Sequence, residues 1–320
     1  MQSQKQTKVE PVSIAVRPLR KSDLPEANRI FHLAFGTFLG LPDPMQFCPD
    51  RDYVCGRYCA YQEGALGAEA HGELVGSNFV TDWGSVGFFG PLTIRPDFWE
   101  RGVAKRLLEP TMQLFERWQT RHAGLFTFSH STKHVHLYQK FGFWPRFLTA
   151  LMFSPVHPSK QPVNGALYSD LAANLQLECL KASRELTDAI FEGLDLQREI
   201  CIVAEQNLGD TVFLWDGSHL AAFAVCHCGA GTEAGEGACY VKFGAARTAE
   251  AFKRLLEACE GLAQRRGLSR LEAGVNMARH KAYERMVAHG FQTRALGVAM
   301  HKPNEPGYNR PEVYLIDDWR

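Results

Sequence analysis

The sequence predicts a mixed α/β protein in which two tandem domains share one plan. Its 320 residues exceed the size of a usual single domain, and patterns typical of strands and helices alternate along both halves. The sequence also repeats itself, because Arg-Leu-Leu-Glu at 106–109 recurs at 254–257 and Gly-Phe at 142–143 recurs at 290–291. Both matches are displaced by 148 residues, from 106 to 254 and from 142 to 290. We therefore expect two copies of one domain.

The composition narrows the range of partners. Lysine plus arginine equals aspartate plus glutamate at 35 each, so the formal net charge is zero. We expect no nucleic acid and no membrane as a partner, and any site for an anion must be local. No apolar run of about 18 residues occurs, and residues 1–10 lack an apolar signal core. These features predict a cytoplasmic protein.

The cysteines do not form a framework. There are nine, an odd number, scattered along a long chain, which favours reduced thiols. Neither Cys226 and Cys228 with His227 between them, nor Cys55 with Cys59, has a second ligand pair at zinc-like spacing. We therefore expect no metal.

The first half predicts strand-rich and helix-rich segments after a disordered tail at 1–12. A helix begins at Ser22 and Asp23, and the segment 36–61 is irregular and rich in aromatic residues that either wall a pocket or pack a helix onto a sheet. The other expected elements are strands at 14–17, 66–70, 74–83, 86–95, 125–129 and 147–153, and helices at 101–122 and 134–140. The order strand, helix, strand around 101–122 implies a parallel pair inside an otherwise antiparallel sheet.

A segment rich in proline separates the halves. Pro155, Pro158 and Pro162 lie among Ser, Lys and Asn, so we expect a domain at 13–155, a linker at 156–166 and a second domain at 167–320. The second half repeats the plan with helices at 167–187 and 248–266, a helix ending near 289, and strands at 211–214, 220–226, 238–245 and 271–275.

Residues 91–109 suit an anion. An apolar strand ends at Arg95 and Pro96, a short loop carries Gly102 and Ala104, and a helix with basic residues in its first turn follows. The first N–H groups of a helix have no intrahelical partner and can bind phosphate oxygens. The alternative is an ordinary strand-to-helix connection with a glycine turn.

Two motifs resemble those of the GNAT acyltransferase superfamily. Ile94, Pro96, Trp99, Gly102 and Ala104 have the spacing of that family's acetyl-CoA pyrophosphate loop, Val-x-Pro-x-x-Gln/Arg-x-x-Gly-x-Gly/Ala. Leu-Tyr-Gln-Lys-Phe-Gly-Phe at 137–143 is similar to its later signature, Leu-Tyr-x-x-x-Gly-Phe. The resemblance implies two tandem GNAT-like domains, each a mixed, mostly antiparallel sheet with a central splayed parallel strand pair flanked by helices.

The resemblance implies acetyl-CoA as a cosubstrate. Amides of the loop would bind its two phosphates, and its pantetheine arm would pair with the strand before the loop, where one amide would polarise the thioester carbonyl. The positions implied to bind acetyl-CoA are Leu92, Thr93, Ile94, Trp99, Glu100, Arg101, Gly102, Val103, Ala104, Lys105, Arg106 and Ser131.

The resemblance also implies direct attack of an amine on the acetyl carbon in a complex of both substrates. Tyr138 would give a proton to the leaving CoA thiolate, although a core tyrosine is the alternative reading. Asp82, at the end of a strand, is the candidate general base, with solvated surface acids or water-mediated deprotonation as alternatives. Other candidates for the base are Glu69, Glu73, His130 and His134.

Several positions depart from the family pattern. Trp99 stands where Gln or Arg is usual, Ser131 replaces a frequent Asn, and His134 replaces a common Ala. In the second copy, the 148-residue shift places Glu250 at the position of Gly102, Phe252 at that of Ala104 and Met286 at that of Tyr138. We expect the carboxylate and the phenyl ring to oppose a pyrophosphate, and Met cannot donate a proton. The second domain is therefore expected to be a degenerate copy without CoA binding.

Three functions follow as hypotheses. The first is an acyl-CoA-dependent N-acyltransferase that acts on a primary amine of a small molecule or peptide. The second is a protein that binds or senses acyl-CoA without turnover, and the third is a structural pseudoenzyme or partner-binding module. We expect a monomer or a homodimer, because a tandem pair can bury the surface that single-domain relatives use to dimerise.

Overall fold

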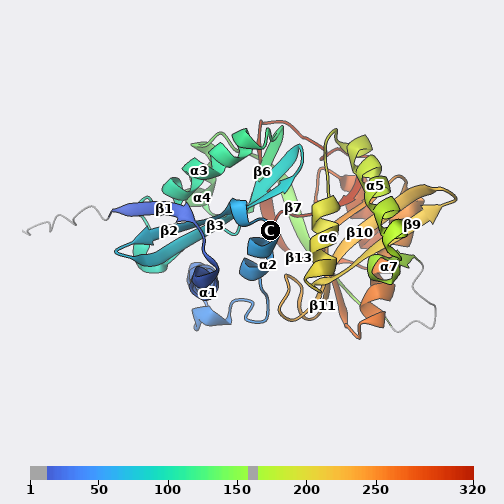
Figure 1. Ribbon diagram of the computed structural model, residues 1–320, viewed down its shortest axis with the longest axis horizontal. Helices are drawn as coiled ribbons and strands as arrows, with labels where there is room; N and C mark the ends of the chain where they lie inside the picture. Colours follow the sequence, from blue (N-terminus) through green and yellow to red (C-terminus); the bar gives the residue numbers. More distant parts are fainter. Residues whose placement is uncertain (1–12, 158–164) are drawn as a thin grey trace, which may run out of the picture.

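A computed structural model describes residues 13–157 and 165–320 (Figure 1). The predicted tail at 1–12 and most of the predicted linker at 156–166 lie outside these residues. The fold is mixed α/β with helices on both faces of a mixed sheet, which confirms the predicted fold class. Within the two described ranges, no helix has the length and apolar character needed to cross a bilayer.

The first half follows the predicted order of elements. Its strands are β1 (Ile14–Pro18), β2 (Ala65–Ala70), β3 (Glu73–Trp83), β4 (Val86–Phe89), β5 (Thr93–Ile94), β6 (His122–Thr127) and β7 (Trp144–Pro155). Its helices are α1 (Leu24–Phe38), α2 (Val54–Ala60), α3 (Val103–Arg117) and α4 (Thr132–Gln139). Helix α2 lies in the segment predicted to be irregular, and α3 is shorter than the predicted 101–122. It begins after Gly102, whose φ of 76° lies in the left-handed region that favours glycine.

The second half has a similar order with additional elements. Its strands are β8 (Ala166–Leu167), β9 (Gly209–Asp216), β10 (His219–Gly229), β11 (Gly235–Ala246), β12 (Arg270–Asn276), β13 (Gln292–Lys302) and β14 (Tyr314–Ile316). Its helices are α5 (Ala173–Ile190), α6 (Gln197–Glu205), α7 (Ala249–Arg265) and α8 (His280–Ala288). The pattern analysis did not predict α6, β13 or β14.

Each half contains the predicted parallel strand pair. Strand β4 pairs with β6 over residues 86–88 and 122–124, and β11 pairs with β12 over residues 238–241 and 270–273. Helix α3 connects the first pair and α7 the second. These crossovers explain why parallel pairs occur in a sheet whose other neighbours are antiparallel.

The two halves exchange their last strands, which the sequence analysis did not predict. The sheet runs β1-β2-β3-β4-β6-β13-β7-β12-β11-β10-β9-β8, so β13 of the second half lies between β6 and β7 of the first. Strand β7 in turn lies between β13 and β12 of the second half. Figure 1 shows β7 and β13 in the middle of the molecule, with α3 and α4 on one side and α5 and α7 on the other.

The register of β7 and β13 has the symmetry of the repeat. Trp144 pairs with His301, and the 148-residue shift converts this pair into Gln292 with Phe153, which is also present. Thr149 pairs with its own counterpart, Gly297. A pseudo-two-fold axis therefore passes between these two strands.

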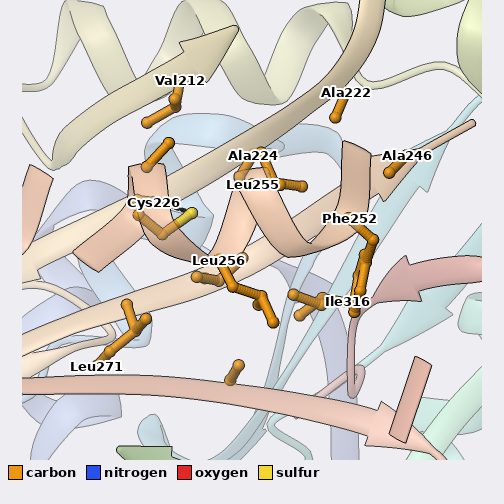
Figure 2. Packing of buried hydrophobic residues seen from close by; sticks show 14 of the residues in the cluster. Val212, Ala222, Ala224, Cys226, Ala246, Phe252, Leu255, Leu256, Leu271 and Ile316 are labelled. Atoms are coloured by element: carbon orange, nitrogen blue, oxygen red, sulfur yellow. Dashed lines mark hydrogen bonds between the residues drawn. The ribbon is translucent and has the colours of Figure 1, made fainter. Parts of the chain in front are cut away.

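The exchanged strands complete each other's hydrophobic cores. Val298 and Met300 of β13 pack in the core of the first half, whereas Ala150 and Met152 of β7 pack in the core of the second. The second core also contains α7, whose Leu255 contributes to the packing over the strands (Figure 2). Neither half buries its apolar surface without a strand from the other.

We predict that Met300→Ala lowers the free energy of unfolding by about 2–5 kcal/mol, because it leaves a cavity in the core of the first half. Met300 is 0% exposed. Leu296→Ala, on the same strand with Leu296 46% exposed, is the matched control and should change stability by less than about 0.5 kcal/mol. Urea unfolding measures both. Equal effects of the two changes would contradict the exchanged core.

Candidate active site

The loop before α3 leaves an open helix start. It runs from Gly90 to Gly102 and includes a short 3-10 turn, Pro96–Phe98. Gly102 caps α3 with its backbone in the left-handed conformation, and no side chain accepts a hydrogen bond from the first turn. A Cβ at Gly102 would meet nothing within 4 Å, so open space adjoins this turn. The free N–H groups at the positive end of the helix dipole form a site suited to an anion.

The corresponding helix of the second half starts differently. Only Arg247 and Thr248 separate β11 from α7, and the Thr248 hydroxyl accepts a hydrogen bond from the Ala251 N–H at 3.1 Å. Glu250 lies exposed in the first turn, as expected. The expectation that Phe252 obstructs a phosphate-facing turn was wrong, because its ring is fully buried in the core near Ile316 (Figure 2). The second copy lacks the loop itself.

Strand β14 lies where the parallel pair of the second half separates. It pairs antiparallel with β11 at Gly244, Ala245 and Ala246, beyond the residues that pair with β12. It also contacts β12 and α8. No strand takes the equivalent place beyond β4 in the described part of the first half, where a cavity lies instead.

A cavity of about 510 Å³ lies over the open helix start. It is lined by most of the residues expected to bind acetyl-CoA, namely Leu92, Thr93, Ile94, Trp99, Glu100, Gly102, Val103, Ala104, Lys105 and Ser131. Arg101 and Arg106 are not among its lining residues. Trp99 donates from its ring N–H to the Ile94 carbonyl at 2.7 Å, so this side chain braces the loop. Glu100 forms an ion pair with Lys133 across the same cavity.

A second cavity of about 450 Å³ adjoins the first. It lies between the separating ends of β4 and β6, and its wall combines α1, the segment after α1, and the exchanged strands. Phe47 and Tyr53 line this cavity and also pack against Phe31 of α1. The aromatic residues of segment 36–61 therefore both wall a pocket and pack a helix, the two alternatives that the sequence left open. The residues common to both cavities are Phe35, Leu92, His134 and Tyr138.

Tyr138 lies at the junction of the two cavities. Its side chain is carried by α4 and is only 7% exposed. Burial raises the pKa of Tyr138, so the hydroxyl keeps its proton at neutral pH. Across the junction, the Leu92 N–H makes no hydrogen bond within the described residues and is free to bind an oxygen atom.

His134 lies one helical turn before Tyr138 on the same side of α4. Burial lowers the pKa of His134 below its ordinary value, and the charges of His130 and Lys133 lower it further. The ring is therefore neutral at neutral pH and can accept a proton. Phe38 packs against it at a centroid distance of 5.0 Å.

Asp82, the expected general base, does not belong to this site. It lies at the end of β3 and lines neither cavity. Its Oδ1 accepts a hydrogen bond from the Gly84 N–H at 2.8 Å. Of the other candidates, Glu69 pairs with Arg17 and Glu73 with Arg95, and only His134 lines the cavities.

Arg57 lines neither cavity but contacts the strand end beside them, a contact that the sequence analysis missed. Its guanidinium donates to the Gly90 carbonyl at the end of β4 and pairs with Glu233 of the second half at 2.9 Å. Burial alone would raise the pKa of Glu233, but Arg57 and Lys242 reverse this effect and hold it well below the ordinary value. This buried ion pair fixes the strand end beside the cavities. No sequence signal indicated it, because its partners are distant in the chain.

The structure contains all nine cysteines as free thiols. Across residues 13–157 and 165–320, no three His, Cys, Asp or Glu side chains are grouped so that they could hold a metal ion.

The separating parallel pair and the helix that connects its strands are features of a GNAT-like fold. Residues 29–143 match the family model described as the acetyltransferase (GNAT) family. This stretch of the first half is therefore similar to an acetyltransferase domain of the GNAT family.

Solved structures extend the similarity to the whole chain. A candidate acetyltransferase from Pyrococcus horikoshii is 14% identical, with a TM-score of 0.68 over 99% of this chain and 98% of its own. A GCN5-related N-acetyltransferase from Sphaerobacter thermophilus is 14% identical, with a TM-score of 0.56 over 90% of this chain and 95% of its own. At these identities the similarity shows the fold alone. Among curated proteins, no sequence matches this chain.

Proposed function

We propose that the first half transfers an acetyl group from acetyl-CoA to the primary amine of a small molecule or peptide. The observation that carries this proposal is the junction of two cavities at Tyr138 and His134. One cavity contains the open helix start suited to a pyrophosphate, and the other is free for the acceptor. Both substrates can then be bound at once, as direct transfer requires.

The donor would extend from the start of α3 to Tyr138. N–H groups of the first turn and Lys105 would bind the pyrophosphate. The pantetheine arm would run along Leu92, Thr93 and Ile94, which line the same cavity. The unpaired Leu92 N–H would donate to the thioester carbonyl oxygen, where negative charge develops during attack. Such a donor typically contributes about 3–4 kcal/mol to stabilisation of the transition state.

The reaction would proceed by direct attack. The amine nitrogen forms a bond to the acetyl carbon, the carbon–sulfur bond breaks, and the electron pair leaves with sulfur. The thiolate takes a proton from the Tyr138 hydroxyl, and His134 takes a proton from the amine nitrogen. Return of that proton to the Tyr138 oxygen regenerates both side chains. The products are the N-acetyl compound and free CoA.

We infer that His134 takes the role first expected of Asp82. It shares both cavities with Tyr138, and its lowered pKa keeps it neutral and able to accept a proton. The sequence analysis noted His134 as a departure from the family pattern. That departure places a proton acceptor where an alanine would provide none.

We further propose that the chain consists of an active copy at 13–155 and a degenerate copy at 167–320. The missing loop, the Thr248 cap and the pairing of β14 with β11 support the absence of CoA binding in the second copy. The second copy instead contributes walls to the acceptor cavity through β12 and β13.

We predict that the protein binds CoA and that Gly102→Glu abolishes this binding. The substitution strains a left-handed position and places a carboxylate beside the pyrophosphate, so affinity should fall at least about 100-fold. Calorimetry with CoA measures this effect. Glu250→Ala, the matched position of the second copy, should leave affinity unchanged. A reversed pattern would assign CoA to the second copy, and no binding to the unsubstituted protein would favour a pseudoenzyme.

We predict that Tyr138→Phe lowers kcat by about 100- to 10,000-fold, because it removes the proton donor to the leaving thiolate. CoA affinity should change little. Thiol release from acetyl-CoA over a panel of amines provides the assay. Undiminished turnover in the variant would exclude Tyr138 as the acid. CoA binding without turnover on any amine would favour a binding or sensory protein.

We predict that kcat falls on the acid side with an apparent pKa below the ordinary histidine value of 6.5, because His134 must be neutral and burial lowers its pKa. Protonation on the acid side removes the base, so the loss appears as pH decreases. The pH profile of kcat measures this decrease, the acid limb of the profile. His134→Gln should lower kcat and remove the limb. If the variant retained the same acid limb, the limb would belong to another group.

A further inference from the structure

The acceptor cavity is apolar and offers no free carboxylate. Its wall is formed mainly by aromatic and aliphatic side chains, among them Phe31, Phe47, Phe128, Leu151, Phe153 and Trp319. The acidic side chain that lines it is Glu272 of β12. Both oxygens of Glu272 accept hydrogen bonds from Arg51 at 2.9 Å, and Arg270 adds a third at 2.8 Å. An acceptor with several ammonium groups would therefore find no unpaired acid along this wall.

The same wall carries an excess of positive charge. Arg51, Arg294 and Arg320 line the cavity together with the single carboxylate of Glu272. Arg51 is committed to Glu272, whereas Arg294 makes no ion pair or hydrogen bond with any residue in the described ranges. The guanidinium of Arg320 is paired with Asp318 at 3.1 Å and lies 3.9 Å from Glu272, so Arg294 is the arginine of this wall without an ion pair among the described residues. An unpaired guanidinium beside an apolar cavity is suited to an anionic group of the ligand.

Resting on the proposed function, we propose that the acceptor is an amine with an apolar or aromatic body that also carries a carboxylate, and that Arg294 binds this carboxylate. The amine would lie at Tyr138 and His134, and the apolar body would lie along the aromatic wall. Arg294 belongs to β13, so the second copy would select the acceptor through the exchanged strand. Arg294 is thus a specificity-determining residue and takes no part in proton transfer.

The test compares matched amines. The probes are 2-phenylethylamine, which lacks a carboxylate, and L-phenylalanine and 4-(2-aminoethyl)benzoate, which add a carboxylate at two different distances from the amine. The measured quantity is kcat/KM for each carboxylate-containing amine, divided by kcat/KM for 2-phenylethylamine. A charge-assisted hydrogen bond predicts a ratio of about 10 to 100 for at least one of them.

Substitution of Arg294 identifies the source of this ratio. Arg294→Met should bring it close to 1, because the guanidinium that favours the carboxylate is gone. Arg117→Met is the matched control, since Arg117 is exposed at the end of α3 and lines neither cavity, and it should leave the ratio unchanged. A ratio near 1 in the unsubstituted protein, or a high ratio that survives Arg294→Met, would overturn the inference.

A binding measurement separates this inference from the proposed function. Calorimetry with the N-acetyl derivatives of the same probes, in the presence of CoA, should show the preference for the carboxylate even if turnover is slow. If the protein binds CoA but prefers no carboxylate-containing probe, either in turnover or in binding of the N-acetyl products, the inference about Arg294 is wrong and the proposed function still stands. Failure of the protein to bind CoA would overturn the proposed function itself.

Discussion

The ladder between β7 and β13 is the interaction on which the rest of the molecule depends. It joins two halves that would otherwise be separate domains, and its register repeats the 148-residue shift of the sequence. Because each strand packs in the core of the other half, separation would expose apolar surface on both sides. Each half therefore depends on the other for a complete core, and the 148-residue shift is present in the backbone pairing of the two strands.

This exchange explains how the second half, which we propose to be a degenerate copy, contributes residues to the proposed active site of the first. Strand β13 brings Arg294 and Ala295 to the acceptor cavity, and β12 adds Glu272. The pair of Arg57 with Glu233 holds the end of β4 from the opposite side. In the proposed function, the first half supplies the groups that would bind CoA and transfer protons, and the second half would help to select the acceptor. A change in acceptor preference could therefore arise without any change in the donor loop.

The sequence predicted features that depend on local pattern. The repeat, the parallel pair and the loop at Gly102 follow from spacing, turn chemistry and hydrophobic periodicity. The exchange could not be predicted, because the pattern of a buried strand indicates its burial and not its neighbours. The choice of Asp82 as the base had a similar cause. The sequence placed Asp82 at the end of a strand but did not indicate which end of that strand lies near the cavities. Tyr138 was found through the resemblance of residues 137–143 to the GNAT signature, and His134 was one of several candidate bases until the structure placed both on α4.

Strand β14 has a consequence for how the first half can be studied. It is an extended chain that hydrogen-bonds to β11 at the point where the parallel strands part. The first half leaves the equivalent place open beside β4. The molecule thus holds, in one copy, a peptide mimic of the extended arm proposed for the other. The pairing of β14 with β11 therefore suggests the backbone geometry with which a peptide-like inhibitor would bind beside β4 in the first half.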